Sequence, residues 1–294
     1  MDNIEKPKRS LWDYIILIIK GLCIGAVDWV PGVSGGTIAF ITGVYKELLY
    51  SFKSINTSLL TLFFRGKWGA FWKQFNGWFL LAIGCGILTS VFSIARLLQH
   101  LIKVYPIPVW SFFTGLVAAA AIYLLRGLKK WSVWNTLVLL ASMVVAFVIC
   151  RLSPGQTPET YWFVFLTGAI AICALLMPGI SGAFVMVLMG KYQFILDAIS
   201  FLRWDVLLVF AAGAITGIVI SSRFLYWLLE RYYSKMVCLM AGFMLGSLEK
   251  LLPVHYTQLS NQPALLVNIL LFIILGFILV FGLEFLAKRM RQEK

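Results

Sequence analysis

Charged residues are scarce in this chain, and acidic residues are the scarcest among them. Only 13% of the 294 residues are charged and 61% are hydrophobic, whereas roughly 25% of the residues of a soluble domain are charged. Apolar runs of about 20 residues, the length that spans a bilayer, follow one another along the chain. The lack of charge therefore excludes a soluble domain and predicts an α-helical membrane protein with several transmembrane spans.

Histidine and cysteine are too few and too dispersed to indicate catalysis or metal binding. His100 lies at the end of an apolar run and His255 lies in a loop. The five cysteines lie in apolar segments or at their ends and show no metal-ligand spacing, so we interpret them as small hydrophobic residues. We therefore expect no metal, no cofactor and no catalytic residue.

Basic residues outnumber acidic ones by 25 to 12, which gives a formal net charge of +13. Most of them lie in loops between apolar runs, so we expect contacts with anionic membrane lipids and none with nucleic acid. Cytoplasmic loops of membrane proteins are enriched in lysine and arginine. With the N-terminus inside, 17 of the 25 basic residues fall on the cytoplasmic side. This bias predicts that both termini are cytoplasmic.

A short motif occurs twice, at a spacing of 147 residues. Pro31-Gly-Val-Ser-Gly-Gly36 interrupts the first apolar run, and Pro178-Gly-Ile-Ser-Gly-Ala183 interrupts a later one. The same spacing relates further identical residues, namely Gly21 and Gly168, Gly43 and Gly190, Tyr45 and Tyr192, and Leu49 and Leu196. An internal duplication sets the architecture of a fold. Broken apolar segments at matching places in two halves indicate the binding site of a transporter.

The duplication continues at a spacing of 127 residues, because the second half lacks most of a basic, aromatic linker at 53–76. The identical pairs are then Gly86 and Gly213, Thr89 and Thr216, Arg96 and Arg223, Leu98 and Leu225, Leu101 and Leu228, Tyr105 and Tyr232, and Gly115 and Gly242. Two apolar helices match at leucine easily by chance. A matched arginine inside apolar spans is much stronger support for a true repeat.

The repeat defines the domain organisation. We expect a tail at 1–10, a first repeat at 11–150, a second repeat at 151–287 and a basic tail at 288–294. The first repeat comprises a hairpin at 11–52, an amphipathic linker at 53–76 and spans within 77–150, and the second comprises a hairpin at 161–201 and spans within 206–286. The individual spans are expected at 77–102, 108–125, 133–150, 206–229, 236–252 and 264–286.

A hairpin returns the chain to the side it left, and three spans then carry it across. The two halves therefore have opposite orientations. The predicted fold is an all-α polytopic membrane protein with an inverted-topology repeat, each half being a re-entrant helical hairpin plus three transmembrane helices. If each hairpin instead crossed the membrane twice, the loops and termini would lie on the same sides of the membrane. We favour re-entrant hairpins, because a glycine-rich tip bearing serine suits a buried bend better than a surface turn.

The residue types at the two tips suit an anion. Proline ends a helix, glycine lets a ligand approach the backbone closely, and serine or threonine can cap the returning helix. Successive N–H groups at a helix start attract anions. The expected phosphate-binding residues are Ser34, Gly35, Gly36, Thr37, Ser181 and Gly182, with Pro31, Gly32, Pro178 and Gly179 forming the tips. The alternative is that these residues only permit close packing at a sharp bend.

Arg96 and Arg223 lie within apolar spans at equivalent repeat positions. An arginine at the bilayer centre costs roughly 2.5–3.5 kcal/mol on insertion scales and usually faces a cavity or a partner. Its planar fork suits phosphate or carboxylate, so we expect both arginines to bind the same anion as the tips. Alternatively, each side chain extends from near a helix end to the lipid headgroups.

Two carboxylates lie in the first hairpin. Asp28, three residues before Pro31, could pair with an arginine, bind a coupling cation, carry a proton or cap a helix. Glu47 is expected near the cytoplasmic face, in a structural, charge-pairing or coupling role.

These residues resemble a known family. Gly21-x3-Gly25-x2-Asp28-x2-Pro31-Gly-Val-Ser-Gly-Gly-Thr37, followed by Gly43-Val-Tyr45, is similar to the signature of the bacterial polyprenyl-phosphate translocases of the PopT type, formerly a domain of unknown function. The resemblance covers essentially the whole chain. It implies a flippase that moves undecaprenyl phosphate, the carrier lipid of peptidoglycan synthesis, from the outer to the inner leaflet of the cytoplasmic membrane. It further implies alternating access around a midplane phosphate site. Ala183 and Phe184 depart from the first-copy pattern.

Two other functions remain open at this point. Undecaprenyl-pyrophosphate phosphatases also use inverted hairpins with a Pro-Gly-x-Ser-Arg-Ser loop, but Gly35 stands at the position of that arginine. No closely spaced glutamate pair lies near the first hairpin either, so hydrolysis lacks its expected catalytic groups. An ion-coupled transporter of a small soluble anion could use the same tips and arginines.

Overall fold

The computed structural model describes residues 9–28, 34–155, 157–252 and 263–292, with the side chains of some helical residues, including Arg96, outside this description. All secondary structure in these ranges is α-helical, which confirms the predicted class. The elements are α1 (Leu11–Asp28), α2 (Gly35–Ile41), α3 (Tyr45–Lys53), α4 (Thr57–Phe64), α5 (Trp68–Phe75), α6 (Gly77–Phe92), α7 (Ile94–Val104), α8 (Pro106–Arg126), α9 (Val133–Arg151), α10 (Tyr161–Leu176), α11 (Gly182–Leu188), α12 (Tyr192–Ser200), α13 (Trp204–Arg231), α14 (Tyr233–Gly246), α15 (Leu248–Leu251) and α16 (Pro263–Gln292).

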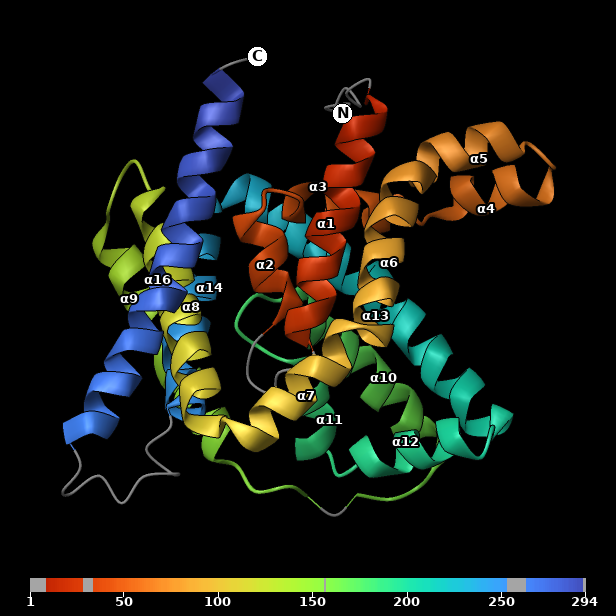
Figure 1. The fold of residues 1–294 in the computed structure, drawn as a ribbon. Helices are drawn as coiled ribbons and strands as arrows, with labels where there is room; N and C mark the ends of the chain where they lie inside the picture. The colour runs from red at the N-terminus through yellow and green to blue at the C-terminus, as the bar shows by residue number, and fades with distance from the viewer. Residues whose placement is uncertain (1–8, 29–33, 156, 253–262, 293–294) are drawn as a thin grey trace.

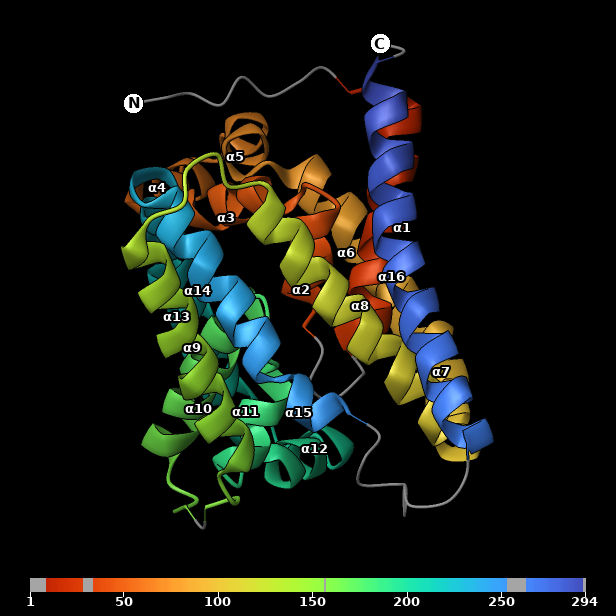
Figure 2. The same ribbon diagram turned by 90° about the vertical axis from the view of Figure 1, so that its left-hand side faces the viewer.

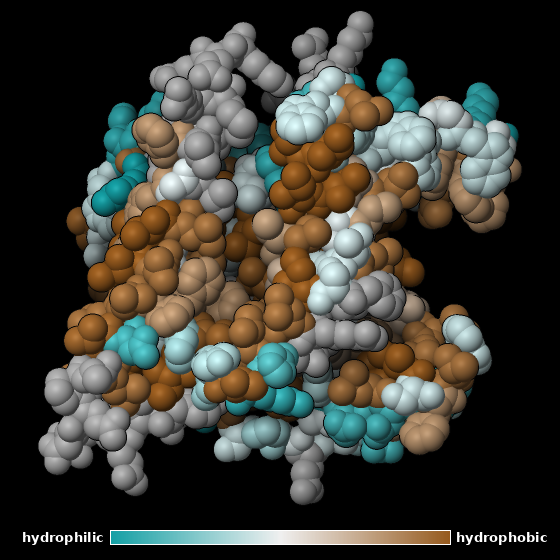
Figure 3. All heavy atoms as spheres, in the orientation of Figure 1, coloured by the Kyte–Doolittle hydropathy of each residue, from teal (hydrophilic) through white to brown (hydrophobic). Residues whose placement is uncertain are grey.

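Within the described residues, four helices are long and apolar enough to cross a membrane. They are α8, α9, α13 and the segment Leu265–Gly282 of α16. The pair of α11 and α12 meets the same criteria together, although it is bent by 107°. On the face shown in Figure 3, hydrophobic surface covers most of the middle of the molecule, and polar side chains lie mainly above and below it. The chain is a multi-pass membrane protein, as its composition predicts.

The molecule has two distinct faces. α1 begins and α16 ends at the same face, which we call the terminal face (Figures 1 and 2). α3, α4 and α5 also lie towards this face, whereas α12 and α15 lie towards the opposite face. The connection from α8 to α9 and the connection from α13 to α14 also lie at the terminal face (Figure 2).

The linker between the first hairpin and α6 forms two short helices, α4 and α5, that extend sideways from the terminal face (Figure 1). The Phe63 ring holds them together, since its centroid lies 4.9 Å from that of Trp68 and 5.6 Å from that of Phe71. Phe64 and Trp68 are 81% and 58% exposed. In Figure 3 the polar side chains of this pair point away from the body and the hydrophobic ones lie beneath, the pattern of helices that lie on a membrane surface.

The helices of the two repeats pack through equivalent glycines. Gly21 of α1 lies against the backbone of Ile83 in α6, and Gly168 of α10 lies against the backbone of Phe210 in α13. A Cβ atom on either glycine would overlap the carbonyl oxygen of its neighbour. Gly21 and Gly168 are repeat equivalents, and so are Ile83 and Phe210. The two contacts are therefore copies of one another.

Other glycines join one repeat to the other. Gly115 of α8 lies against the backbone of Ile273 in α16, and its repeat equivalent Gly242 of α14 lies against Leu139 in α9. In each case a helix from the first half packs against a helix from the second. Small residues let transmembrane backbones approach closely, where van der Waals packing holds them together. The halves thus interlock and form one body.

The predicted span at 77–102 is not continuous, because the chain breaks at Ser93 into α6 and α7. The Ser93 hydroxyl donates to the carbonyl of Thr89 at 2.6 Å, and serine bonding to the carbonyl four residues earlier often bends a helix. The repeat equivalent of Ser93 is Ile220, which lies inside the continuous helix α13. The repeats therefore differ at this position, and α7 runs obliquely towards the opposite face (Figure 1).

Candidate functional site

The first hairpin consists of α1 and α2, with α3 continuing from α2 after a break at Gly43. Pro31 and Gly32 lie outside the described residues, so the first tip is described from Ser34 onward. Ser34 caps α2, because its backbone is extended (φ −111°, ψ 131°) and its Oγ accepts a hydrogen bond from the Gly36 amide at 3.2 Å. The serine of the first motif therefore starts the returning helix.

The second hairpin consists of α10 and α11, with α12 continuing after a break at Gly190. Gly179, at its tip, has a φ of +93°, a conformation that favours glycine. A Cβ atom there would lie 2.7 Å from the Met244 amide nitrogen, so the tip is inserted against α14. Ser181 caps α11 and accepts a hydrogen bond from the Phe184 amide at 3.4 Å. The serine of each motif therefore caps the helix that follows it.

The two tips meet inside the protein. The Ser34 hydroxyl donates to the Met177 carbonyl at 3.3 Å, and the buried Tyr45 hydroxyl donates to the Leu176 carbonyl at 2.9 Å. α1 and α2 approach this point from the terminal face, whereas α10 and α11 approach from the opposite face (Figure 1). The carbonyls that receive these bonds lie at the end of α10, where helical carbonyls have no partner within the helix.

Two glycines of the predicted site make close packing contacts. A Cβ atom on Gly36 would lie 3.2 Å from the Leu175 carbonyl oxygen of the second hairpin, and one on Gly182 would lie 2.6 Å from the Ala171 carbonyl oxygen. Both positions therefore allow backbones to approach each other closely. This is what the alternative explanation, close packing at a sharp bend, predicts. Because Gly36 has no side chain, the backbone of the first tip lies directly against that of the second hairpin.

The Asp28 carboxylate binds the Gly35 amide, which was predicted to bind a phosphate. Its Oδ1 accepts a hydrogen bond of 2.6 Å from the Gly35 amide, at the start of α2. A Cβ atom on Gly35 would lie 2.5 Å from the same oxygen, so only glycine fits beside this carboxylate. The Asp28 carboxylate therefore accepts a hydrogen bond from an amide at the start of α2, which is the capping role among the alternatives considered for it.

Thr37 places an unused hydroxyl beside the tips. The residue is 1% exposed, and its Oγ1 has no hydrogen-bond partner among the described residues. A buried polar group without a partner costs about 1–3 kcal/mol. Of the polar side chains predicted for the site, Thr37 is the one whose hydroxyl makes no hydrogen bond at all among the described residues.

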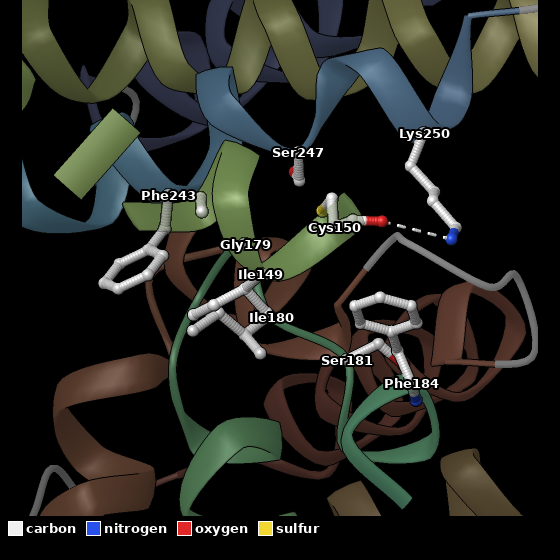
Figure 4. Close-up of a pocket in the computed structure, with 10 residues that line it drawn as sticks. Ile149, Cys150, Gly179, Ile180, Ser181, Phe184, Phe243, Ser247 and Lys250 are labelled. Carbon is white, nitrogen blue, oxygen red and sulfur yellow. Dashed lines mark hydrogen bonds between the residues drawn. The ribbon is translucent and has the colours of Figure 1, made fainter. Parts of the chain in front are cut away.

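A small cavity adjoins the second tip, between α9, α11 and the α14–α15 region (Figure 4). The centres of water-sized molecules have about 20 Å³ in it, and its empty space, including open solvent, is about 360 Å³. Its lining residues are Ala146, Ile149, Cys150, Gly179, Ile180, Ser181, Phe184, Phe243, Ser247 and Lys250. The cavity thus leads from the surface to the capped start of α11.

Of the two predicted arginines, Arg223 has a described side chain, and its contact lies away from the tips. Arg223 is exposed on α13, and its Nη2 donates to the Ile55 carbonyl at 2.8 Å, in the loop between α3 and α4. It therefore lies towards the terminal face. Arg96 lies in α7, but its side chain is outside the described residues. Among the described residues, the Arg223 guanidinium makes no hydrogen bond with Ser34 or Ser181.

Glu47 takes part in a charge pair near the terminal face. Its carboxylate accepts from Arg9 Nη2 at 2.6 Å and from Asn76 Nδ2 at 2.8 Å. The Arg9 and Glu47 side chains are only 13% and 23% exposed. This network joins the residues before α1 to α3 and to the start of α6, so the contacts of Glu47 in this structure are structural.

A sequence profile of the family described as undecaprenyl phosphate translocase-like matches residues 24–265, which include both hairpin tips and the linker. The chain belongs to this family. A polyprenyl-phosphate transporter of Vibrio cholerae is 37% identical over 94% of this chain and 98% of its own length. A polyprenyl-phosphate transporter of Staphylococcus aureus is 32% identical over 90% of this chain and 93% of its own length. No solved structure matches the chain.

Membership of the translocase-like family confirms the resemblance that the first motif carries. Both relatives are named as transporters and not as enzymes, which agrees with the prediction of a transporter. The sequence did not single out Lys250 as a site residue in this translocase-like protein. Lys250 lines the cavity beside the second tip, and it belongs to neither motif and to no repeated pair.

Proposed function

We propose that this protein moves polyprenyl phosphate, and undecaprenyl phosphate in particular, from the outer to the inner leaflet of the bacterial cytoplasmic membrane. One observation carries the proposal above the others. Two polar hairpin tips meet inside a multi-pass membrane protein, at Ser34 and Met177, in a chain whose relatives are named polyprenyl-phosphate transporters. A lipid phosphate needs polar contacts within the membrane, while its hydrocarbon tail stays in the bilayer.

The lengths of the returning helices support re-entrant hairpins. α2 and α11 have seven residues each, and a rise of 1.5 Å per residue makes each helix about 10 Å long. A hydrocarbon core is about 30 Å thick, so neither helix crosses it. Non-helical backbone at this depth is tolerated where it is buried in protein, and the contact between the tips buries it.

The packing supports an inverted repeat. The hairpins approach from opposite faces (Figure 1), and the equivalent glycines Gly21 and Gly168 make equivalent contacts. Inverted halves of this kind supply the two arrangements that alternating access requires. The tips are joined by the hydrogen bonds of Ser34 and Tyr45, each worth about 0.5–1.5 kcal/mol net. Bonds of this strength can be broken and re-formed in every transport cycle.

The tips would bind the phosphate through hydroxyls and amides. In this arrangement Thr37 donates its free hydroxyl, and Ser34 and Ser181 give up their present bonds when the headgroup arrives. Asp28 holds the Gly35 amide by a bond of 2.6 Å, and two negative charges at one amide repel each other. Asp28 would therefore move away or bind a cation or proton as the phosphate binds, which is its proposed coupling role.

The arginines would act at the two membrane surfaces and not at the midplane. Arg223 lies exposed towards the terminal face, where it would meet the headgroup as the headgroup enters or leaves the lipid. Arg96 lies in α7, which runs towards the opposite face (Figure 1), and it would have the equivalent role there. An inverted repeat places equivalent residues on opposite sides, so one arginine would serve each leaflet.

We propose that the terminal face is cytoplasmic. The connection from α8 to α9 carries Lys129 and Lys130, and the connection from α13 to α14 is flanked by Arg231 and Lys235. Both connections lie at the terminal face (Figure 2), and short cytoplasmic loops are enriched in such residues. The helix pair α4–α5 would then lie on the inner leaflet, with its basic residues near anionic lipid headgroups.

The proposal is tested with the purified full chain in liposomes that contain polyprenyl phosphate in both leaflets. A water-soluble lipid phosphatase added outside hydrolyses only the lipid that is present in the outer leaflet. We expect hydrolysis to stop at that pool in protein-free liposomes and to proceed to the inner pool in liposomes with the protein. Equal extents of hydrolysis in both preparations would refute transport of this lipid.

Two further measurements separate the alternatives. Phosphate release from polyprenyl pyrophosphate by the purified protein alone would indicate a phosphatase instead. Uptake of radiolabelled inorganic phosphate into the same liposomes, without any protein-dependent exposure of the lipid, would indicate a transporter of a small anion. We expect neither phosphate release nor uptake of inorganic phosphate.

A further inference from the structure

The cavity beside the second tip has features that the central contact of the tips lacks. It lies between α9, α11 and the α14–α15 region, and α15 lies towards the opposite face (Figure 2). Figure 4 shows Ser181, Phe184 and Lys250 together on one side of the lining. Most of its wall is apolar, with Ala146 and Ile149 on one side and Phe243 on another. The cavity therefore combines a hydrocarbon-like wall with a few polar groups, the usual composition of a ligand site.

Lys250 brings a positive charge to this side of the lining without a carboxylate partner. Its neighbour Glu249 is engaged by Arg151, whose Nη2 and Nε lie 2.6 Å and 3.0 Å from one carboxylate oxygen. Lys250 Nζ has only a long bond of 3.4 Å to the Cys150 carbonyl. In the described part of the chain, no carboxylate lies within ion-pair distance of this ammonium. Its charge is therefore available to an anion.

Phe184 explains why the second motif departs from the first. The Lys250 ammonium lies 4.8 Å from the centroid of the Phe184 ring, a distance at which the ring face attracts a cation. The first motif has Thr37 at the equivalent position, and no lysine is recorded there among the described contacts. The aromatic ring thus positions Lys250 at the cavity and adds apolar surface beside it.

Ser181 completes the polar side of the cavity. It is 6% exposed, and its Oγ accepts from the Phe184 amide. Its hydroxyl hydrogen has no recorded acceptor among the described residues, so it can donate to a ligand oxygen. The space of about 20 Å³ for the centres of water-sized molecules is close to that of one water. A phosphate would therefore need the open side of the cavity as well, and Lys250 and Ser181 both line the cavity.

We propose that this cavity is the site where the phosphate headgroup of a prenyl phosphate first binds from the opposite face, with Lys250 as the cation that recognises it. The inference rests on the proposed function and adds a binding site and a residue to it. The phosphate contacts Lys250 and Ser181, and the first prenyl units lie along the apolar wall formed by Ile149 and Phe243. The headgroup then lies next to the second tip, and the second tip lies between the headgroup and the first tip.

The test uses the purified full chain in detergent and measures binding by calorimetry. The probes are farnesyl phosphate, which has both phosphate and prenyl groups, farnesol, which lacks the phosphate, and inorganic phosphate, which lacks the prenyl chain. The variants are Lys250→Gln, which removes the charge, and Lys250→Arg, which retains it. Lys129→Gln is the matched control, because Lys129 is an exposed lysine at the terminal face.

We expect Lys250→Gln to weaken farnesyl phosphate binding about tenfold or more, the usual effect of losing one bond to a charged group. Farnesol binding should not change, Lys250→Arg should bind within a few-fold of the unmodified protein, and Lys129→Gln should bind normally. Inorganic phosphate should bind much more weakly than farnesyl phosphate. Lys250 is exposed, so these variants should elute from gel filtration like the unmodified protein.

Several results would overturn the site. Unchanged farnesyl phosphate binding by Lys250→Gln, equal losses in Lys250→Gln and Lys129→Gln, or equal affinity for inorganic and farnesyl phosphate would each do so. If the unmodified protein still exposes polyprenyl phosphate in the liposome assay, only the site fails. If the unmodified protein neither binds farnesyl phosphate nor moves the lipid, the proposed function fails as well.

Discussion

Replacing Tyr45 with phenylalanine tests whether the contact between the two tips controls opening of the protein. The Tyr45 hydroxyl is buried and donates to the Leu176 carbonyl at 2.9 Å. Tyr45→Phe removes only this oxygen and leaves the ring in place against Phe40, 5.3 Å away between centroids. The Leu176 carbonyl then loses a partner in a region that water does not reach.

The size of the effect follows from the burial of both groups. Tyr45 and Leu176 are 2% and 5% exposed, so the carbonyl left behind is not solvated. We estimate the loss at about 1–2 kcal/mol, which changes the equilibrium between joined and separated tips by roughly 5- to 30-fold. The separated state should therefore become more populated in Tyr45→Phe by that factor.

Hydrogen–deuterium exchange of the purified protein measures this change directly. Amides of α2 exchange when the first tip separates from the second, so their exchange should become faster by the same factor. Amides of α16, which packs against α8 at Ile273 and Gly115, should exchange at unchanged rates. Faster exchange throughout the protein would indicate general destabilisation instead.

The repeat supplies a matched control. Tyr192 is the equivalent of Tyr45 in the second half, and no hydrogen bond of its hydroxyl is recorded among the described residues. Tyr192→Phe removes the same atom and should leave α2 exchange unchanged. Equal exchange of α2 in the unmodified protein, Tyr45→Phe and Tyr192→Phe would show that the tip contact does not control opening.

Three further predictions concern packing and the site. Gly21→Leu should abolish a folded product on gel filtration, because even a Cβ atom would overlap the backbone of α6, whereas Gly84→Leu should fold, since nothing lies within 4 Å of its Cβ position. Thr37→Val should raise the melting temperature, because it removes a buried hydroxyl without a partner at a cost of about 1–3 kcal/mol, and should slow lipid movement in the liposome assay; a lower melting temperature would contradict this reasoning. Arg223→Gln should slow lipid movement severalfold with a normal elution profile, and Arg65→Gln, which alters another exposed arginine of the chain, should not; equal rates in both would exclude the role of Arg223.

The class and the internal symmetry of this protein could be predicted from its sequence. Both depend on features that are local in the chain, namely apolar runs, Pro-Gly breaks and residues repeated at constant spacing. The capping serines Ser34 and Ser181 are of the same kind, because a cap acts on amides two or three residues away. The signature around the first tip was likewise sufficient to identify the family. The break at Ser93 was missed, since a hydroxyl bonding to a preceding carbonyl bends some helices and leaves others straight.

The tertiary structure decided which groups meet. Tyr45 and Leu176 are 131 residues apart in sequence, and no local pattern reports such a contact. The same is true of Lys250 and Phe184, whose proximity depends on how α15 packs near α11. Arg223 shows the reverse case, because its position in the repeat predicted a place at the tips and the packing of α13 directs it to the loop after α3. Hydrophobicity and backbone chemistry act along the chain and can be read from it, whereas the partners of a polar side chain depend on the relative positions of whole helices.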